Sequence, residues 1–339
     1  MRILIASGIY PPDIGGPAQY ARNLYETWKK EGHDVKVAAY RWERAFPPLV
    51  RHILFFLKII RKGWKADLIL VLDTWSAAVP TMYACRLMNK KYIIRTGGDF
   101  LWETYVERTG DLVLFRDFYS ASLNKLSRKE KLIFKLGGES LRKANAIIFS
   151  TEWQKEIFEK AYLLNSARCY IVENYCGERK EPVESENRLF VAGSRFVKLK
   201  NMDLLKSAFE EARIEVKKRG FEDIELDCGK AIYDSFVEKI HQAYAVIIAS
   251  ISDISPNIVA DAISVGTPFI VTKETGMTDQ IKKAGLLIDP LDKKDIVDKI
   301  VWISDPVNRK QMAEKVRGLS FVHTWKDVAD EILKIWNKT

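Results

Sequence analysis

Three segments of this sequence combine residue types that could bind an anionic ligand, and each follows an apolar stretch typical of a β-strand. The first segment, Gly8–Pro17, carries Gly15 and Gly16 at its end. Glycine lets the backbone approach a ligand closely, and the N–H groups at the start of a helix attract anions. Pro17 is typical of a first helical turn. A plain turn would give the same pattern, and no GxGxxG dinucleotide fingerprint is present.

The second segment places two cations just beyond a predicted strand. It reads Ala192-Gly193-Ser194-Arg195, and Lys200 follows five residues after the arginine. Arg195 offers a planar fork of donors and Lys200 a point charge, so the pair could hold a diphosphate. Lys198 lies beside them, and a solvated basic loop is therefore the alternative interpretation.

The third segment carries two acids around the start of a predicted helix. Asp253 lies in the loop after a strand, and Ser255 and Pro256 are typical of a helix start. Gly266 is typical of a helix end, which places Asp261 inside the helix. Two carboxylates near one helix N-terminus can accept hydrogen bonds from sugar hydroxyls. The alternative is a capping acid followed by a surface acid.

Short apolar strands that alternate with helical segments must position these residues. This alternation predicts parallel sheets covered on both faces, and ligands bind such sheets at the carboxyl ends of their strands. We expect strands at Arg2–Ser7, Val35–Tyr40, Leu68–Asp73, Tyr92–Thr96, Ala146–Ser150 and Tyr170–Glu173, and again at Leu189–Gly193, Ile224–Asp227, Ala245–Ser250, Phe269–Thr272 and Leu286–Asp289. We therefore predict an N-terminal domain over residues 1–175, a polar linker over 176–187 and a C-terminal domain over 188–322. A final helical segment, 323–339, is expected to pack back on the first domain.

Length and composition agree with two globular domains. The chain has 339 residues, of which 47% are apolar and 29% charged. No apolar run approaches the roughly 20 residues that span a bilayer, and no cleavable signal pattern precedes the first strand. The four cysteines form no CxxC pair and the four histidines no metal-ligand spacing. These patterns argue against a disulfide scaffold and a zinc site, and they favour a cytoplasmic protein.

The positive charge is concentrated in the N-terminal half. The net charge is +9, and residues 1–180 hold 30 Lys and Arg against 19 Asp and Glu. Residues 51–65 and 125–143 combine cations with apolar side chains, which suits helices lying at an anionic membrane interface. The alternative is that Ile53, Leu57 and Ile60 face the core. Nucleic acid is not an expected partner, because charge alone suggests it and no RNA- or DNA-binding motif is present.

The three segments, in this order, resemble the retaining glycosyltransferases of family 4. The matching elements cover nearly the whole chain: the PPxxGG-like loop Pro11–Gly16, Ser194-Arg195 with Lys200, an acid-x7-acid element from Asp253 to Asp261 that continues through Ala262–Ile270, and the segments Thr275–Asp279 and Gly285–Asp292. The resemblance implies an α/β fold of the GT-B type. In that fold two Rossmann-like, doubly wound domains face one another across a cleft, and here the second is expected to be somewhat reduced.

The resemblance also implies a role for each residue. A nucleotide-diphosphate sugar of the UDP or GDP type would be the donor, and a glycan or a lipid-linked molecule the acceptor. Arg195 and Lys200 would neutralise the departing diphosphate, so no metal or other cofactor is expected. Asp261 would hold the ribose and Asp253 the transferred sugar. Gly15 and Gly16 would approach the phosphate and sugar.

On the acceptor side, the sequence resembles a subgroup of the family that has a Gly-Asp-x-x-Trp-Glu segment. Here this segment contains Asp99, Trp102 and Glu103. Asp99 just past a strand could position an acceptor hydroxyl or accept its proton, with Trp102 and Glu103 as further candidates. A helix-capping role for Asp99 is the alternative.

Three departures from the family pattern distinguish this chain. Both acids of the acid-x7-acid element are Asp rather than Glu, and Ser194 replaces the glycine before Arg195. Between Lys206 and Ala245 we find one clear strand where the family usually has two. We predict a retaining hexosyltransferase of polysaccharide biosynthesis, peripheral on the inner membrane face. The alternative is a noncatalytic binding or scaffold subunit of the same fold.

Overall fold

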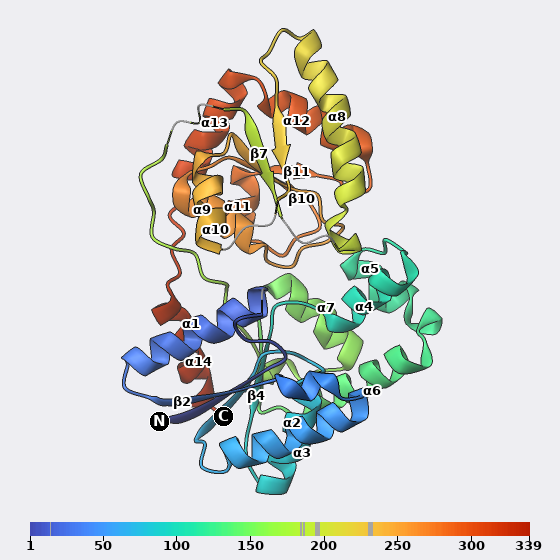
Figure 1. Ribbon diagram of the computed structural model, residues 1–339, viewed down its shortest axis with the longest axis vertical. Coiled ribbons are helices and arrows are strands. Elements are labelled where there is room, and N and C mark those ends of the chain that lie inside the picture. The colour runs from blue at the N-terminus through green and yellow to red at the C-terminus, as the bar shows by residue number, and fades with distance from the viewer. Residues whose placement is uncertain (14, 184, 186, 194–196, 230–232) are drawn as a thin grey trace. The chain divides into compact units, whose positions relative to one another are not determined.

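The computed structural model describes the chain apart from residues 14, 184, 186, 194–196 and 230–232 and the side chain of Asp234. The chain divides into two compact units (Figure 1). Unit 1 comprises Met1–Thr104, Tyr119–Glu173 and Trp325–Thr339. Unit 2 comprises Tyr105–Phe118 and Asn174–Thr324. None of the described helices is long and apolar enough to cross a membrane.

Unit 1 is built on a parallel sheet of six strands in the order β2-β1-β3-β4-β5-β6. The strands are β1 (Arg2–Ser7), β2 (Asp34–Ala39), β3 (Leu68–Val71), β4 (Ile93–Thr96), β5 (Ala146–Phe149) and β6 (Cys169–Ile171). β1 lies between its two neighbours, with Ile3 opposite Val35 on β2 and Leu68 on β3. Because the inner strands are buried on both faces, they appear in the sequence as continuous apolar runs.

Helices cover both faces of this sheet. They are α1 (Gly16–Lys30), η1 (Trp42–Ala45), α2 (Pro48–Gly63), α3 (Ala78–Met88), α4 (Phe100–Thr109, which ends in unit 2), η2 (Leu123–Lys125), α6 (Arg128–Lys143), α7 (Glu152–Tyr162), η3 (Ser166–Arg168) and α14 (Trp325–Trp336). α1 packs against α14, and α2 against α3 (Figure 1). Ile3 and Ile5 join the cluster that contains α1 and α14, whereas Leu4 lies next to Gly63 of α2. The strand period of two therefore assigns alternate residues to the two helical layers.

The last helix completes the core of unit 1. Val328, Ala329 and Ile332 are fully buried in the cluster that contains α1. Trp325 meets Tyr20 of α1 edge to face, with ring centroids 5.2 Å apart. The C-terminal residues thus lie in the same unit as the N-terminus.

Unit 2 contains a parallel sheet of five strands in the order β11-β10-β9-β7-β8. The strands are β7 (Leu189–Ala192), β8 (Glu225–Asp227), β9 (Ala245–Ile248), β10 (Phe269–Thr272) and β11 (Leu286–Ile288). The helices are α5 (Phe115–Ala121, which ends in unit 1), η4 (Lys198–Lys200), α8 (Met202–Lys218), α9 (Tyr233–Gln242), α10 (Asn257–Val265), α11 (Asp279–Ala284), α12 (Lys293–Ile303) and α13 (Pro306–Arg317). Both sheets confirm the predicted α/β class with its smaller second domain. All the predicted strands are present, with ends that shift by up to two residues.

The two units differ in two places from the boundaries that we expected. Residues 105–118 group with unit 2, where the Phe115 N–H donates to Ser252 Oγ at 3.0 Å. The expected linker also begins inside unit 2, because the Lys180 N–H donates to the carbonyl of Ser264 at 2.7 Å. These long-range bonds decide the grouping, and nothing in the local sequence announces them.

Candidate functional site

Three loops of unit 2 meet at the carboxyl edge of its sheet. The Ile251 N–H after β9 donates to the carbonyl of Leu199 after β7, at 3.0 Å. The Asp253 N–H donates to the carbonyl of Glu274 after β10, at 2.9 Å. Parallel strands end at the same edge, so the backbone itself gathers the residues that follow each strand. This edge is where ligands bind in open α/β sheets.

Lys200 and Asp253 face one another at this edge. Lys200 Nζ lies 2.6 Å from Asp253 Oδ2, and the two side chains are 28% and 15% exposed. Ser250 Oγ lies 3.4 Å from the same carboxylate oxygen. The structure thus joins two residues that the sequence separates by more than fifty positions. Arg195, the predicted partner of Lys200, lies outside the described residues.

Asp261 lies in α10, and a tyrosine holds its carboxylate. The hydroxyl of Tyr233 donates to Asp261 Oδ1 at 2.8 Å. The side chain is almost fully buried, and burial raises the pKa of Asp261 to about 6. α10 ends as predicted at Gly266, which adopts a left-handed conformation. Tyr233 has no local sequence signal, because its contact with Asp261 spans 28 residues.

Glu274 is a buried acid at this edge that our sequence reasoning did not select. It follows β10 directly and is 2% exposed. Arg116 Nη2 lies 3.0 Å from Glu274 Oε1. Burial raises the pKa of Glu274, and the charge of Arg116 opposes this shift. A charged residue just past a buried strand could have indicated Glu274, but no spacing in the sequence indicates Arg116.

In unit 1, the glycine segment turns the chain from β1 into α1. Gly15 has a φ of 152°, in a region open almost only to glycine. Its carbonyl accepts hydrogen bonds from the N–H groups of Ala18 and Gln19, both at 3.1 Å. Pro17 occupies the first turn and lacks an N–H group. The helix start that we predicted is therefore confirmed, and Gly16 is the first residue of α1.

Asp99 is buried at the start of α4. Its Oδ1 accepts hydrogen bonds from the N–H groups of Leu101 at 2.9 Å and Trp102 at 3.1 Å. The hydroxyl of Tyr119 donates to Oδ2 and lies 2.9 Å from the hydroxyl of Tyr162. Burial raises the pKa of Asp99 to about 6. The observed contacts are those of the capping role that we considered as the alternative.

The two other acceptor-side candidates differ in accessibility. Trp102 is 3% exposed. Glu103 is partly exposed, and its Oε1 approaches Gly98 so closely that a Cβ added there would lie 2.9 Å away. Of the three candidates around α4, Glu103 is therefore the most accessible to a substrate.

The structure thus divides the predicted site residues between two groups. Lys200, Asp253 and Asp261 belong to unit 2, and the first two are in contact. Gly15, Gly16, Asp99, Trp102 and Glu103 belong to unit 1. The functional roles assigned to these residues stay predictions.

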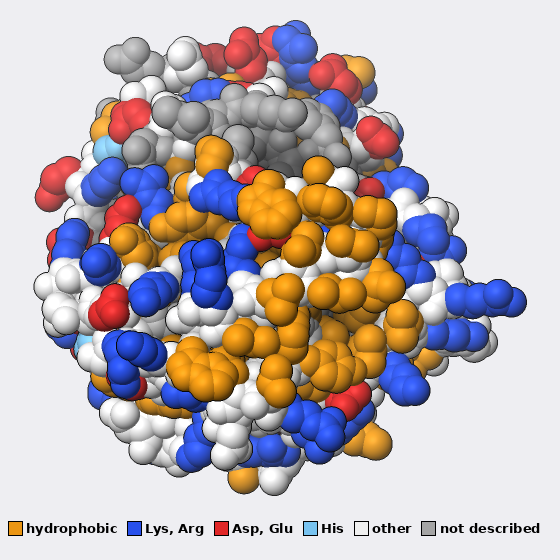
Figure 2. Space-filling view, turned by 60° about the horizontal axis from the view of Figure 1, so that its bottom comes forward, with side chains coloured by type: hydrophobic (Ala, Val, Ile, Leu, Met, Phe, Trp, Pro, Cys, Tyr) orange, Lys and Arg blue, Asp and Glu red, His pale blue; other side chains and the backbone are white. Residues whose placement is uncertain are grey.

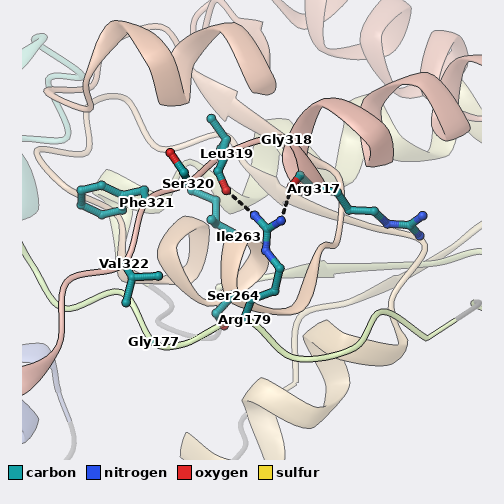
Figure 3. A pocket seen from close by; sticks show the side chains of 10 residues that line it. All are labelled: Gly177, Arg179, Ile263, Ser264, Arg317, Gly318, Leu319, Ser320, Phe321 and Val322. Carbon is teal, nitrogen blue, oxygen red and sulfur yellow. Dashed lines mark hydrogen bonds between the residues drawn. The ribbon is translucent and has the colours of Figure 1, made fainter.

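Two other features of the described residues bear on ligand binding. No group of three or more His, Cys, Asp or Glu among the described residues could hold a metal ion. A cavity of about 420 Å³ lies in unit 2, lined by Gly177, Arg179, Ile263, Ser264 and residues 317–322. Arg179 extends toward the backbone carbonyls of Arg317 and Leu319 and donates to both (Figure 3). The lining of this cavity contains no carboxylate and none of the predicted site residues, so we do not place the donor there.

Neither a protein-family model nor a curated protein sequence matches this chain. Solved structures do match it over nearly their whole length. Sucrose-phosphate synthase from Thermosynechococcus elongatus is 14% identical, with 100% of this chain and 99% of that chain covered and a TM-score of 0.70. WaaG, a glycosyltransferase involved in lipopolysaccharide biosynthesis, is 14% identical, with coverage of 97% and 99% and a TM-score of 0.65. The catalytic domain of starch synthase IV from Arabidopsis thaliana, bound to ADP and acarbose, is 11% identical, with coverage of 99% of both chains and a TM-score of 0.64. With its two parallel-sheet domains, the chain has the GT-B fold of these glycosyltransferases.

Proposed function

We propose that this chain is a retaining glycosyltransferase. It transfers a hexose-type sugar from a nucleoside-diphosphate sugar to a glycan or a lipid-linked acceptor at the cytoplasmic face of a membrane. The contact between Lys200 and Asp253 at the carboxyl edge of a GT-B sheet carries this proposal. WaaG, described as acting in lipopolysaccharide biosynthesis, supports an acceptor of the glycolipid type.

The ion pair suggests how the donor is held. A partly exposed ammonium can exchange a carboxylate partner for the oxygens of a diphosphate, which carries more negative charge. Lys200 and Arg195 then neutralise the diphosphate as it leaves, and Asp253 becomes available to accept hydrogen bonds from the sugar hydroxyls. The two cations supply the electrostatic role that a divalent metal would otherwise fill, so we expect no resident metal. Attack on the face from which the diphosphate departs gives retention.

The remaining roles follow the positions of the side chains. Asp261, held by Tyr233, accepts hydrogen bonds from the ribose. Gly15 and Gly16 approach the phosphate and sugar with their backbone. Glu103 contacts the acceptor hydroxyl, because it is partly exposed, whereas Asp99 is buried and positions the start of α4.

An exposed apolar face on η1 and α2 supports the membrane part of the proposal. We define this face by Trp42, Phe46, Leu49, Val50, Ile53 and Leu57, whose exposure ranges from 40% at Val50 to 74% at Leu49. The core of unit 1 takes Phe55 and Ile59 instead. Figure 2 turns the part of the molecule that holds α2 and α3 toward the viewer and shows a broad gathering of hydrophobic side chains edged by Lys and Arg. Such a combination suits an anionic lipid interface.

A second basic element lies on α6, which packs against α3 as α3 packs against α2. Its cations Arg128, Lys129, Lys131 and Lys135 are all exposed. Cations near an anionic membrane contribute about 1 kcal/mol each. The two stretches that the sequence singled out, 51–65 and 125–143, therefore belong to one layer of helices.

A screen of sugar donors tests the function. UDP- and GDP-sugars are incubated with the protein and short lipid-linked glycans, and release of the nucleotide and transfer of the sugar are measured together. We expect one donor to be consumed with transfer and retention of configuration. Calorimetric donor affinity without turnover across all acceptors would instead favour a noncatalytic subunit.

A further inference from the structure

The single turn η1 presents three different surfaces. Arg41 precedes η1 and Arg44 lies within it, and the Arg44 N–H donates to the Arg41 carbonyl at 3.2 Å. Both arginine side chains reach the segment Gly8–Asp13. Trp42 is 61% exposed and meets the ring of Phe46 edge to face, with centroids 5.9 Å apart. Glu43 is fully buried and forms an ion pair with Lys58 of α2. Thus one surface faces solvent, one is anchored on α2, and the third carries two arginines.

The two arginines hold the segment Gly8–Asp13 that leads from β1 toward α1. Arg44 Nη1 and Nη2 bind the two carboxylate oxygens of Asp13 at 2.7 and 2.6 Å, and Nη2 also lies 3.3 Å from the carbonyl oxygen of Gly8. Arg41 Nη2 donates to the carbonyl of Pro11 at 2.7 Å. A bidentate arginine–carboxylate pair fixes orientation as well as distance. Asp13 also accepts the N–H of Tyr10 at 3.2 Å, which closes the segment on itself.

We propose that docking of Trp42 and Phe46 at an anionic lipid surface orders the Gly8–Asp13 segment through Arg41 and Arg44, and so couples membrane binding to the glycine segment of the donor site. This inference rests on the proposed function, in which Gly15 and Gly16 approach the donor. It adds that the acceptor's membrane and the donor's binding segment are joined by η1.

The coupling has a defined physical basis. A lipid surface shifts an equilibrium only if it binds one state better than another. Trp42 lies in η1 and Phe46 follows it, with their rings in contact, so a lipid surface that takes up both side chains favours this turn. The same turn brings Arg41 and Arg44 to the segment. Lipid binding therefore favours the state in which Arg41 and Arg44 hold the Gly8–Asp13 segment. When docking reduces the conformational freedom of η1, it also reduces that of the segment.

Hydrogen exchange of the backbone amides of Gly8, Ile9, Tyr10 and Asp13 measures this coupling without any assay of sugar transfer. The protein is examined alone, with phosphatidylcholine vesicles, and with vesicles that also contain phosphatidylglycerol, and co-sedimentation reports binding. We expect the mixed vesicles to slow exchange in this segment at least about fivefold, the lower end of typical coupling between sites.

Two variants and a control make the test specific. Arg44→Gln removes the bidentate contact, and Asp13→Asn removes the same contact from the other side while keeping the size of the side chain. Arg213→Gln is the control, because it removes a bidentate pair of the same kind, between Arg213 and Asp223 in unit 2. We expect all three variants to sediment with mixed vesicles and only the control to show the slowed exchange.

The outcomes separate this inference from the function it rests on. Equal slowing in Arg44→Gln, Asp13→Asn and the wild-type protein would overturn the coupling, as would vesicle binding without any slowing. A wild-type protein that fails to bind mixed vesicles would overturn membrane docking and the coupling together. Sugar transfer to a soluble acceptor is measured separately, and its absence would overturn the proposed enzyme while leaving the exchange result to decide the coupling.

Discussion

Lys200 Nζ lies 2.6 Å from Asp253 Oδ2 and thereby joins the loop after β7 to the loop after β9. Both side chains remain partly exposed, so a ligand can reach the pair. In the proposed function, each partner offers what one part of a sugar nucleotide requires.

The buried carboxyl of Asp99 predicts a pH-dependent stability. Its pKa is raised to about 6, so the folded state binds a proton more tightly than the unfolded state. The stability tied to this group is fully present below pH 4 and is lost as the pH rises through 6. An Asp99→Asn variant keeps a capping oxygen and does not titrate. The free energy of unfolding of the variant minus that of the wild-type protein should therefore rise by up to about 3 kcal/mol as the pH goes from 4 to 7.

Urea denaturation of the wild-type protein, Asp99→Asn and Tyr119→Phe at several pH values measures this difference. A constant difference between Asp99→Asn and the wild-type protein across this range would show that the pKa of Asp99 is not raised.

The exposed apolar face predicts a selective loss of vesicle binding. Ile53→Asp and Leu57→Asp should each weaken co-sedimentation with anionic vesicles roughly tenfold or more, because burial of such a side chain contributes about 1.5–3 kcal/mol. Ile214→Asp is the matched control, since Ile214 is 58% exposed on α8 of unit 2. Equal loss in all three variants would point to a general effect of charge instead.

Substitution of Asp261 should change the affinity for the sugar donor. Replacing it by Ala removes the carboxylate that we assign to the ribose, and a hydrogen bond to a charged group contributes about 1.5–3 kcal/mol. The KM for the nucleotide sugar should therefore rise roughly tenfold or more, with a smaller effect on kcat. Steady-state kinetics over a range of donor concentrations measures both. An unchanged KM would remove Asp261 from the donor site.

The next prediction concerns Gly285, just before β11, where the structure leaves no space for a side chain. A Cβ at this position would overlap the ring of Phe269, which is fully buried. Gly285→Ala should lower the free energy of unfolding by about 1–3 kcal/mol. Gly193→Ala is the control for stability, because a Cβ at Gly193 would meet none of the described atoms within 4 Å. Urea denaturation compares the two, and equal stabilities would contradict the packing that we describe.

The sequence predicted the strands well because buried parallel strands are continuous apolar runs. All four residues of β3 and of β9 are buried, and turn residues or polar residues bound each run. The sequence also predicted the end of α10, because Gly266 adopts the left-handed conformation that ends a helix. The start of α10 lies one residue later than predicted, with Pro256 rather than Ser255 as the N-cap. Local rules therefore reach as far as the elements and their order.

Contacts between distant residues were beyond these rules. Arg116 meets Glu274, and Tyr119 meets Asp99, with no spacing in the sequence that relates them. α2 shows a second limit of prediction from sequence, because its buried side and its exposed side are both apolar. Periodicity could not tell that Phe55 would be buried and Ile53 and Leu57 exposed, since this depends on which stripe meets the sheet.

Turnover of a Lys200→Ala variant tests the central claim most directly. If Lys200 neutralises the departing diphosphate, kcat should fall about 10²–10³-fold with the donor found by the screen, and Arg195→Ala should fall similarly. Lys326→Ala is the control, because Lys326 forms ion pairs with Asp330 and Glu31 within unit 1. A Lys200→Ala enzyme that turns over as fast as the wild-type enzyme and the control would contradict the account.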